Sequence, residues 1–538
     1  MKLRIFKKAA LVLTAVAFIS SCSKKLDLFP TNDLTPDKVY ATSAGYKSVL
    51  AKLYATLSLT GNVGPAGSPD IAGGLDEGSQ VPFIRSFFNH QELPTDEAIV
   101  AWDDQTIKNF HNMNWNSADP FILGMYARPI YNITLINEYI RESADDKVAA
   151  RGITGNDAAE IKKSRAEARF LRAFNYWVMM DLFGKSTFIT EADGIGFFLP
   201  AEKDRAGLFT YIESELKAVE AELGNPKTAE YGRVDKAAVW SLLARIYLNA
   251  KIYTGTERNT EAITYASKVL TAGYSLHPKY KELFMADNNL CTDEIIWTAN
   301  CDGLQTQSYG NTTFFIHAAS GSDNNDFGAS GGWSGYRSTK GLANLFPAGA
   351  NGNLDSTRDK RAAMFYTSTR QASPSQIAIT NVGEFTEGMA VKKYVNIKST
   401  GAIGNDPTKT YADCDWIIFR LAEMNLLYAE AVLRGGSGGS TAQALTYFNA
   451  VRARSGAAPM SSITLQDVLD ERGRELFWEG HRRTDLIRYN QFTTAAYLWP
   501  WKGGVATGTS VDSRYNLYPI PVTNLSSNQN LRQNPGYN

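Results

Sequence analysis

The chain lacks the features that mark several common classes of protein. Only five of its 538 residues are histidine, and they are scattered, with no HExxH sequence and no i,i+4 pair. Lys plus Arg and Asp plus Glu number 55 each, so the formal net charge is zero. No basic tract or acidic tail indicates a nucleic-acid partner. The composition therefore argues against a histidine-based metalloenzyme and against a protein that binds polyelectrolytes.

Cysteine is also scarce. Four cysteines occur, and one of them, Cys22, directly follows an N-terminal leader. The other three, Cys291, Cys301 and Cys414, match no zinc-binding spacing. One pair can form a disulfide in an oxidising compartment, or all three can be buried free thiols. The sequence leaves both alternatives open, and these cysteines carry no functional signal.

Two short sequences look catalytic but lack the required context. Residues 435–439 (GGSGG) fit G-x-S-x-G, yet a nucleophile elbow needs a preceding strand, and here a predicted helix leads into a Gly/Ser linker. Gly184-Lys185-Ser186 resembles the end of a P-loop, but the required earlier glycine falls on Met179 within a predicted helix. No carboxylate spacing singles out an acid/base pair. Neither sequence therefore predicts catalysis, and our leading expectation is a protein that is not an enzyme.

The N-terminus reads as a lipoprotein signal peptide. Four basic residues precede an apolar run from Ala9 to Ile19, which is too short to span a bilayer. Ile19-Ser20-Ser21-Cys22 then resembles a bacterial lipobox, in which the cysteine is acylated and becomes the first mature residue. A plain secretory signal with an incidental cysteine is the alternative. Residues 1–21 are thus a predicted signal peptide, and lipid on Cys22 would hold a soluble body at a membrane.

Most of the remaining chain has helical periodicity. From Ile161 to Lys185, Phe170, Phe174 and Trp177 recur at i, i+4 and i+7 beside a second apolar stripe, and Gly184 ends the segment. A helix with so wide an apolar face needs partners to cover it. The sequence predicts a first partner helix that Thr35-Pro36 opens and that has an apolar stripe from Tyr46 to Leu57. Further partner helices are predicted at 119–141, with a kink at Pro129, and at 208–223, 235–253, 257–272, 417–433, 441–454 and 465–489.

Helix pairs of this length with short turns resemble tetratricopeptide repeats. We therefore predict one mainly α domain over 22–538, with a tetratricopeptide-like scaffold at about 36–60, 119–300 and 415–490. Large irregular insertions would fill about 61–118 and 301–413, with short strand-like pieces at 313–316 and 390–395.

Several blocks of the sequence resemble the SusD/RagB family. They are GSPDIAGGLDEG, FFNHQELPTDE, ARFLRAFNYWVMMDLFGK, FRLAEMNLLYAEAVLR, ERGRELFWEGHRRTDLIRYNQF and the closing YPIPVTNLSSNQNLRQNPGYN. Members are outer-membrane lipoproteins of Bacteroidetes that bind nutrients for a SusC-like TonB-dependent transporter. The resemblance covers the chain after Cys22 and is strongest to a starch-binding member. It implies surface exposure, a glycan ligand and no required cofactor.

The resemblance also implies ligand-binding residues. Trp102, Tyr309 and Trp333 match an aromatic platform for a helical α-glucan. The family's acidic and basic partners correspond to Asp76 and Arg85, although this chain is one residue longer between them. An amide three residues after the platform tryptophan is Asn in the family and Gln105 here, which lengthens the arm that would reach a sugar hydroxyl.

Starch or malto-oligosaccharide is the predicted ligand. The alternatives are another glycan or peptides within the same family role, a surface glycoside hydrolase, and a helical scaffold without a small ligand. Oxygen-bearing residues at Asp287, Asn289, Asp413 and Asp415 have spacings that suit a structural calcium ion if their segments meet. We favour turn capping for these four residues and keep calcium as the alternative.

Overall fold

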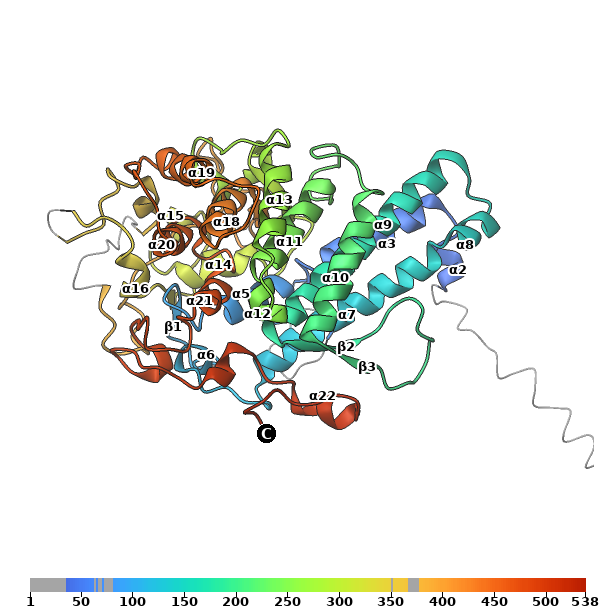
Figure 1. The fold of residues 1–538 in the computed structure, drawn as a ribbon, viewed down its shortest axis with the longest axis horizontal. Coiled ribbons are helices and arrows are strands. Elements are labelled where there is room, and N and C mark those ends of the chain that lie inside the picture. Colours follow the sequence, from blue (N-terminus) through green and yellow to red (C-terminus); the bar gives the residue numbers. More distant parts are fainter. Residues whose placement is uncertain (1–34, 62–63, 66–69, 72–80, 350–351, 366–376) are drawn as a thin grey trace, which may run out of the picture.

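The computed structural model describes residues 35–538 except 62–63, 66–69, 72–80, 350–351 and 366–376. The signal peptide, Cys22 and Asp76 lie outside this range. Figure 1 shows an elongated array of helices, with irregular segments gathered at one end and along one side. No helix within the described residues is both long and apolar enough to cross a membrane.

Helix α9 (Gly155–Leu182) is the centre of one half of the array. It packs against α3 (Ser43–Ala55), α7 (Pro120–Glu142) and α10 (Arg205–Glu220). Phe170 and Phe174 of its apolar face are fully buried. The predicted end is confirmed, because Gly184 has φ of +69° just past Leu182. The helix begins six residues earlier than the predicted Ile161.

The second half continues the array across the large insertion. Helix α11 (Lys236–Leu248) packs on α13 (Asn259–Leu270), and α13 packs on α18 (Leu421–Leu433), although 150 residues separate them in the sequence. Helices α19 (Thr441–Arg454) and α20 (Leu465–Leu476) complete it. The insertion between α13 and α18 is tied at its base by an antiparallel ladder of β4 (Ile295–Ala299) and β6 (Trp416–Arg420).

Shorter elements connect and cover these helices. The helices are α2 (Pro36–Val39), α5 (Phe83–Gln91), α6 (Asn109–Asn112), α8 (Asp145–Ala150), α12 (Ala250–Thr254), α14 (Thr312–Ala319), α15 (Asn324–Phe327), α16 (Lys340–Ala343), α21 (Arg482–Arg488) and α22 (Val522–Ser527). The 3₁₀ helices are η1 (Tyr280–Phe284), η2 (Asn288–Leu290), η3 (Lys360–Phe365), η4 (Lys502–Gly504) and η5 (Ser513–Asn516). Two further ladders pair β1 (Ile99–Val100) with β5 (Tyr336–Arg337), and β2 (Lys185–Phe188) with β3 (Ala201–Asp204).

Several predicted bounds are confirmed by local capping. Helix α19 matches its predicted range, with Ser440 accepting the Gln443 N–H. Helix α7 begins at Pro120, and the Asp119 carboxylate accepts the N–H groups of Phe121 and Ile122. It is one helix to Glu142, with Pro129 inside it. Such caps are encoded within four residues, so a pattern along the chain finds them.

Other predictions were wrong where tertiary contacts overrode the pattern. The predicted helix 417–433 starts with strand β6, because a short apolar run that is buried on both faces fits either structure. The predicted strand 313–316 is part of α14, which Asn311 caps at the Thr313 N–H. Residues 390–395 form no strand. The predicted irregular insertion at about 61–118 contains α5, all of whose residues are buried.

Three predicted helices are each divided in two, and the one opened by Thr35-Pro36 becomes α2 and α3. Helix 235–253 becomes α11 and α12, joined at Asn249. Helix 465–489 becomes α20 and α21, because the backbone turns at Trp478 and Gly480, where φ is +63° and +82°. The three cysteines Cys291, Cys301 and Cys414 are free and buried, which is one of the two alternatives that the sequence left open.

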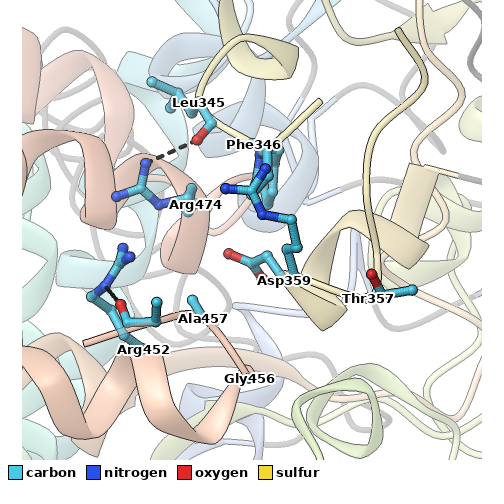
Figure 2. Close-up of a pocket in the computed structure, with 11 residues that line it drawn as sticks. Leu345, Phe346, Thr357, Asp359, Arg452, Gly456, Ala457 and Arg474 are labelled. Atoms are coloured by element: carbon cyan, nitrogen blue, oxygen red, sulfur yellow. Dashed lines mark hydrogen bonds between the residues drawn. The ribbon is translucent and has the colours of Figure 1, made fainter. Parts of the chain in front are cut away.

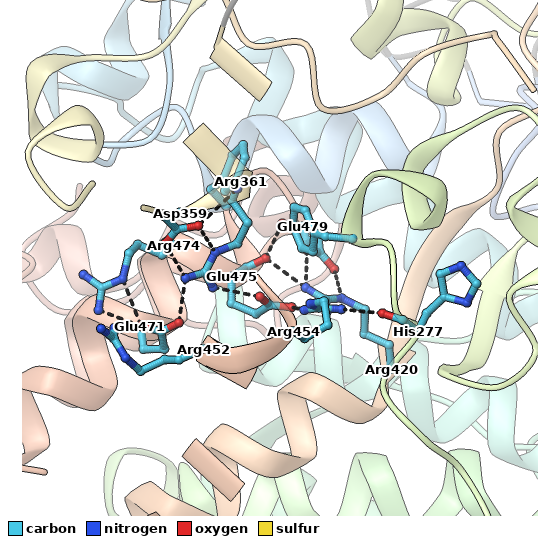
Figure 3. Close-up of polar contacts among 12 residues, drawn as sticks. His277, Asp359, Arg361, Arg420, Arg452, Arg454, Glu471, Arg474, Glu475 and Glu479 are labelled. Atoms are coloured by element: carbon cyan, nitrogen blue, oxygen red, sulfur yellow. Dashed lines mark hydrogen bonds and ion pairs between the residues drawn. The ribbon is translucent and has the colours of Figure 1, made fainter. Parts of the chain in front are cut away.

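A buried ionic cluster joins α20 to the insertion and to β6 (Figure 3). Glu475 accepts from Arg361 of η3 at 2.9 Å and from Arg420 of β6 at 2.6 Å. Arg420 also pairs with Glu479 at 2.7 Å. Burial alone would raise the pKa of Glu471, but the charges of neighbouring arginines, Arg361 foremost, lower it to about 2. The carboxylates therefore stay ionised, and each is matched by cations from a different segment.

Removing one member of this cluster should destabilise the whole domain. We expect Glu475→Gln to lower the free energy of unfolding by about 3–5 kcal/mol, because buried guanidinium groups would lose their charge partner. Urea unfolding followed by circular dichroism measures this. The control is Glu138→Gln, which breaks a more exposed pair with Arg141 and should cost under about 1 kcal/mol. Equal losses in the two variants would contradict the structural role of the cluster.

A second buried contact links the segment after α5 to the turn between α20 and α21. The Glu92 carboxylate accepts the N–H groups of Gly480 at 2.6 Å and His481 at 3.0 Å. The Glu97 carboxylate accepts the Trp478 N–H at 2.9 Å, and the Trp478 indole donates to the Glu97 carbonyl at 2.8 Å. Burial raises the pKa of Glu92 well above its usual value and that of Glu97 to about 7. The pair therefore retains a proton near neutral pH.

This pair predicts a pH dependence. A carboxyl whose folded-state pKa is raised contributes stability below its unfolded pKa near 4.5, and this contribution is lost as pH rises through about 7. The Glu92 and Glu97 side chains hydrogen-bond to each other through the retained proton. In Glu92→Gln, an amide N–H takes the place of that proton at every pH. The unchanged protein loses stability between pH 5 and pH 8.5, and we expect this loss to be smaller in Glu92→Gln by on the order of 2 kcal/mol. Chemical unfolding at both pH values measures the loss. Glu138→Gln is the control, and an unchanged loss in Glu92→Gln would refute the shared proton.

Candidate functional site

The three aromatic residues predicted to bind ligand lie together. The rings of Tyr309 and Trp333 are 6.0 Å apart, centroid to centroid. Trp102 contacts Gly335, two residues after Trp333, so closely that a Cβ on Gly335 would lie 2.2 Å from the indole nitrogen. The Ala101 N–H donates to the Gly335 carbonyl at 2.9 Å, which extends the β1–β5 ladder to this point. The short ladder thus joins residues that are more than 200 positions apart.

The cluster is open to solvent on one side. Trp333 is 37% exposed, and Trp102 and Tyr309 are partly exposed. The Trp102 ring meets the buried rings of Phe314 and Tyr336 edge-on. Trp102 therefore has one side against the core, and all three platform residues keep part of their surface exposed.

His317 of α14 supports Trp333, and the sequence analysis did not identify it. Its ring stacks on the indole at 4.9 Å with an interplanar angle of 24°. The Trp333 N–H donates to the His317 carbonyl at 2.7 Å. The pKa of His317 is lowered by burial, so the ring is neutral, and its Nε2 donates to the Thr410 carbonyl at 2.8 Å. A lone histidine between apolar residues gave no sign of this role in the sequence.

Tyr411 is a second residue that sequence reasoning missed. Its ring lies 5.3 Å from Tyr309, and the two hydroxyl groups are 3.0 Å apart. The Tyr411 N–H donates to the Asp406 carboxylate at 2.9 Å, which fixes the backbone of this loop. Tyr411 and Trp333 therefore flank Tyr309, and the aromatic surface is wider than the predicted three residues.

The predicted polar contacts differ in their placement. Arg85 of α5 is buried, with its guanidinium carbon 5.7 Å from the Trp102 ring and 4.4 Å from that of Phe314. It lies under the platform, so its contact with a ligand stays a prediction. Gln105 is exposed and has φ of +43°, a left-handed conformation that asparagine adopts more readily than glutamine. Asp76 lies outside the described residues.

The two segments that carry the proposed calcium ligands do meet, but the side-chain amide of Asn288 makes the contact. Asn288 donates to the Asp415 carbonyl at 3.0 Å and accepts its N–H at 3.0 Å. The Asp415 carboxylate accepts from Cys301 and Tyr231, and that of Asp413 accepts from backbone N–H groups of Gly303 and Asn405. The described residues contain no group of three or more His, Cys, Asp or Glu side chains that could hold a metal ion. Calcium at Asp287, Asn289, Asp413 and Asp415 stays an untested prediction.

A separate cavity of about 490 Å³ lies between residues 345–347 and 357–359 on one side and α19, the turn after it and α20 on the other (Figure 2). Arg452 and Arg474 line it, but both already pair with the buried Glu471. None of the aromatic cluster residues lines this cavity. The cavity is therefore separate from the candidate site.

Comparisons with known proteins bear on this site. The SusD family model matches residues 293–537. The chain is 36% identical to the starch-binding protein SusD of Bacteroides thetaiotaomicron, over 98% of each chain. It is 25% identical to a SusD-like protein of Bacteroides ovatus, over 91% of this chain and 84% of that one.

Solved structures show the same fold at lower identity. The surface glycan-binding protein A from Bacteroides uniformis superimposes with a TM-score of 0.68 at 20% identity, over 92% of this chain and 99% of that one. A laminarin-binding SusD-like protein superimposes with a TM-score of 0.63 at 21% identity, over 92% and 99% of the two chains. These matches confirm the predicted mainly helical fold.

The contact between Gly335 and Trp102 predicts a sensitive position. Gly335 has φ of +100°, so Gly335→Ala would strain the backbone and push its Cβ into the indole. We expect a cost of roughly 1–3 kcal/mol and a displaced Trp102. In fluorotryptophan-labelled protein, the ¹⁹F resonance assigned through Trp102→Phe should shift.

Gly331→Ala is the matched control, because nothing lies within 4 Å of a Cβ there and its φ is not positive. It should leave the Trp102 resonance in place. An unmoved resonance in Gly335→Ala would show that Trp102 does not pack on this glycine.

Proposed function

Because this chain belongs to the SusD family, we propose that it is a non-catalytic lipoprotein of the outer-membrane surface that captures starch or malto-oligosaccharides. It would pass them to a SusC-like TonB-dependent transporter. The observation that carries the proposal is the convergence of Trp102, Tyr309 and Trp333 on one solvent-exposed cluster. The name of the 36% identical relative, a starch-binding protein, supports an α-glucan as the ligand.

The chemistry of the cluster suits a sugar. A glucose ring has apolar C–H faces that pack on aromatic rings, and its hydroxyl groups need polar partners. Tyr309 and Trp333 meet at 58°, so their rings form an angled surface rather than a flat one. Such a surface suits a curved glucan chain better than a straight one. Asp103, Asp104 and Gln105 follow Trp102 directly and are exposed, so we expect polar contacts with sugar hydroxyl groups there.

Weak binding is expected and fits the proposed role. Each stacking contact is worth on the order of 1 kcal/mol beyond buried area. After the cost of association, a few such contacts support dissociation constants of roughly micromolar to millimolar. A protein that captures a glycan and then releases it to a transporter needs this range. Acylation of Cys22 would keep it at the membrane.

Removal of Trp333 tests the proposal. Native electrophoresis in gels that contain amylopectin should retard the protein, and Trp333→Ala should weaken binding by about 5-fold or more, because one stacking contact is lost. Phe197→Ala is the control, since Phe197 is 97% exposed and lies outside the cluster. It should migrate as the unchanged protein does.

The alternatives give different results in the same assay. Retardation by another glycan, such as laminarin, with none by amylopectin would assign a different ligand within the same family role. Release of reducing ends from a retained polysaccharide would identify a glycoside hydrolase. Equal retardation of the unchanged protein and Trp333→Ala would show that the aromatic cluster is not part of the binding site.

A further inference from the structure

The loop between β2 and β3 exposes four apolar side chains within five residues. Ile195 is 83% exposed, Phe197 97%, Phe198 41% and Leu199 42%. Figure 1 shows this loop projecting away from the helices below α7 and α10. From Gly194 to Pro200 the sequence carries no charge. We call residues 194–199 the apolar loop. Contiguous exposed aromatic and aliphatic groups of this kind mark a surface that another body covers.

The base of the apolar loop is held in place. On its N-terminal side, Arg141 donates to the carbonyl groups of Glu191 at 3.3 Å and Asp193 at 3.5 Å. On its C-terminal side, Asn530 donates to the Leu199 carbonyl at 2.9 Å. The four apolar residues are therefore presented at the end of a braced hairpin, and they do not fold back onto the core.

The loop lies at the same end of α7 as the start of the described chain. Tyr139, in the last turn of α7, packs on Tyr40 at the end of α2, with ring centroids 6.4 Å apart. Arg141, two residues further on, holds the base of the loop. Only 12 residues separate α2's Thr35 cap from Cys22, and they span at most about 40 Å. A lipid on Cys22 therefore keeps this end of the molecule close to the bilayer.

We propose that the apolar loop inserts into the lipid interface and forms a second membrane contact beside the acylated Cys22. Aromatic and aliphatic side chains on an uncharged, convex tip suit the boundary between headgroups and acyl chains. Because no charged residue lies between Gly194 and Pro200, entry of the tip into the interface buries no side-chain charge. The inference rests on the proposed acylation of Cys22, and it adds a fixed orientation of the domain on the membrane.

A probe on the loop tests the contact in the full lipoprotein. Because Cys291, Cys301 and Cys414 are buried, a polarity-sensitive maleimide should label Phe197→Cys selectively. After reconstitution into phosphatidylcholine vesicles, we expect a blue-shifted emission and quenching by brominated lipid. The matched control is Leu290→Cys, which is 70% exposed on η2 and should report water. Water-like emission at both positions would overturn the proposal.

A second measurement removes the lipid anchor. The chain that begins at Ser23 contains every described element, and it should float with phosphatidylcholine vesicles at least 10-fold more than its Phe197→Ser/Phe198→Ser variant. Because the tip is uncharged, phosphatidylglycerol and salt should change this little. Amylopectin retardation of the same variants shows that they are folded, and it separates failure of this inference from failure of glycan binding. Loss of transporter co-purification without any vesicle binding would assign the loop to the protein partner instead.

Discussion

Charge pairing without water is the constraint on which the described structure most depends. Glu471, Glu475 and Glu479 project from α20 and the turn after it, four residues apart, into a core where no solvent can screen them. Each needs cations, and Arg361 and Arg420 arrive from segments that are far away in the sequence. The irregular insertion cannot separate from the helices without leaving buried charges unpaired. The block ERGRELFWEG, which carries these three glutamates, therefore ties the helices to the insertion.

This constraint extends to the aromatic cluster. The turn that ends α20 donates hydrogen bonds to Glu92 and Glu97, and Arg482 pairs with Asp96 at 2.8 Å. The chain then continues directly into β1 and Trp102. Strand β5 follows Gly335, which lies against that indole two residues after Trp333. A surface that binds through ring faces needs its rings held in fixed relative positions, and the buried ionic contacts beneath it supply that rigidity.

The two exposed apolar surfaces differ in kind. Trp333 has a stacked histidine behind it and a tyrosine beside it, so it presents a shaped surface with polar neighbours. Phe197 projects with three other apolar side chains from the end of a hairpin. The first arrangement suits a ligand with an apolar face and a polar edge, and the second suits a medium without defined shape. Both are compatible with a protein that captures a nutrient at a membrane surface.

The sequence by itself determined the features whose cause is local. The apolar face of α9, the Asp119 cap of α7 and the Ser440 cap of α19 are set within a few residues of one another, and family resemblance pointed to Trp102, Tyr309 and Trp333. Only the tertiary structure decided that Ile417 lies in a strand paired with Thr298, that α14 is a helix, and that His317 and Tyr411 support the aromatic residues. These outcomes depend on contacts between distant segments, and periodicity along the chain carries no information about which distant segments meet.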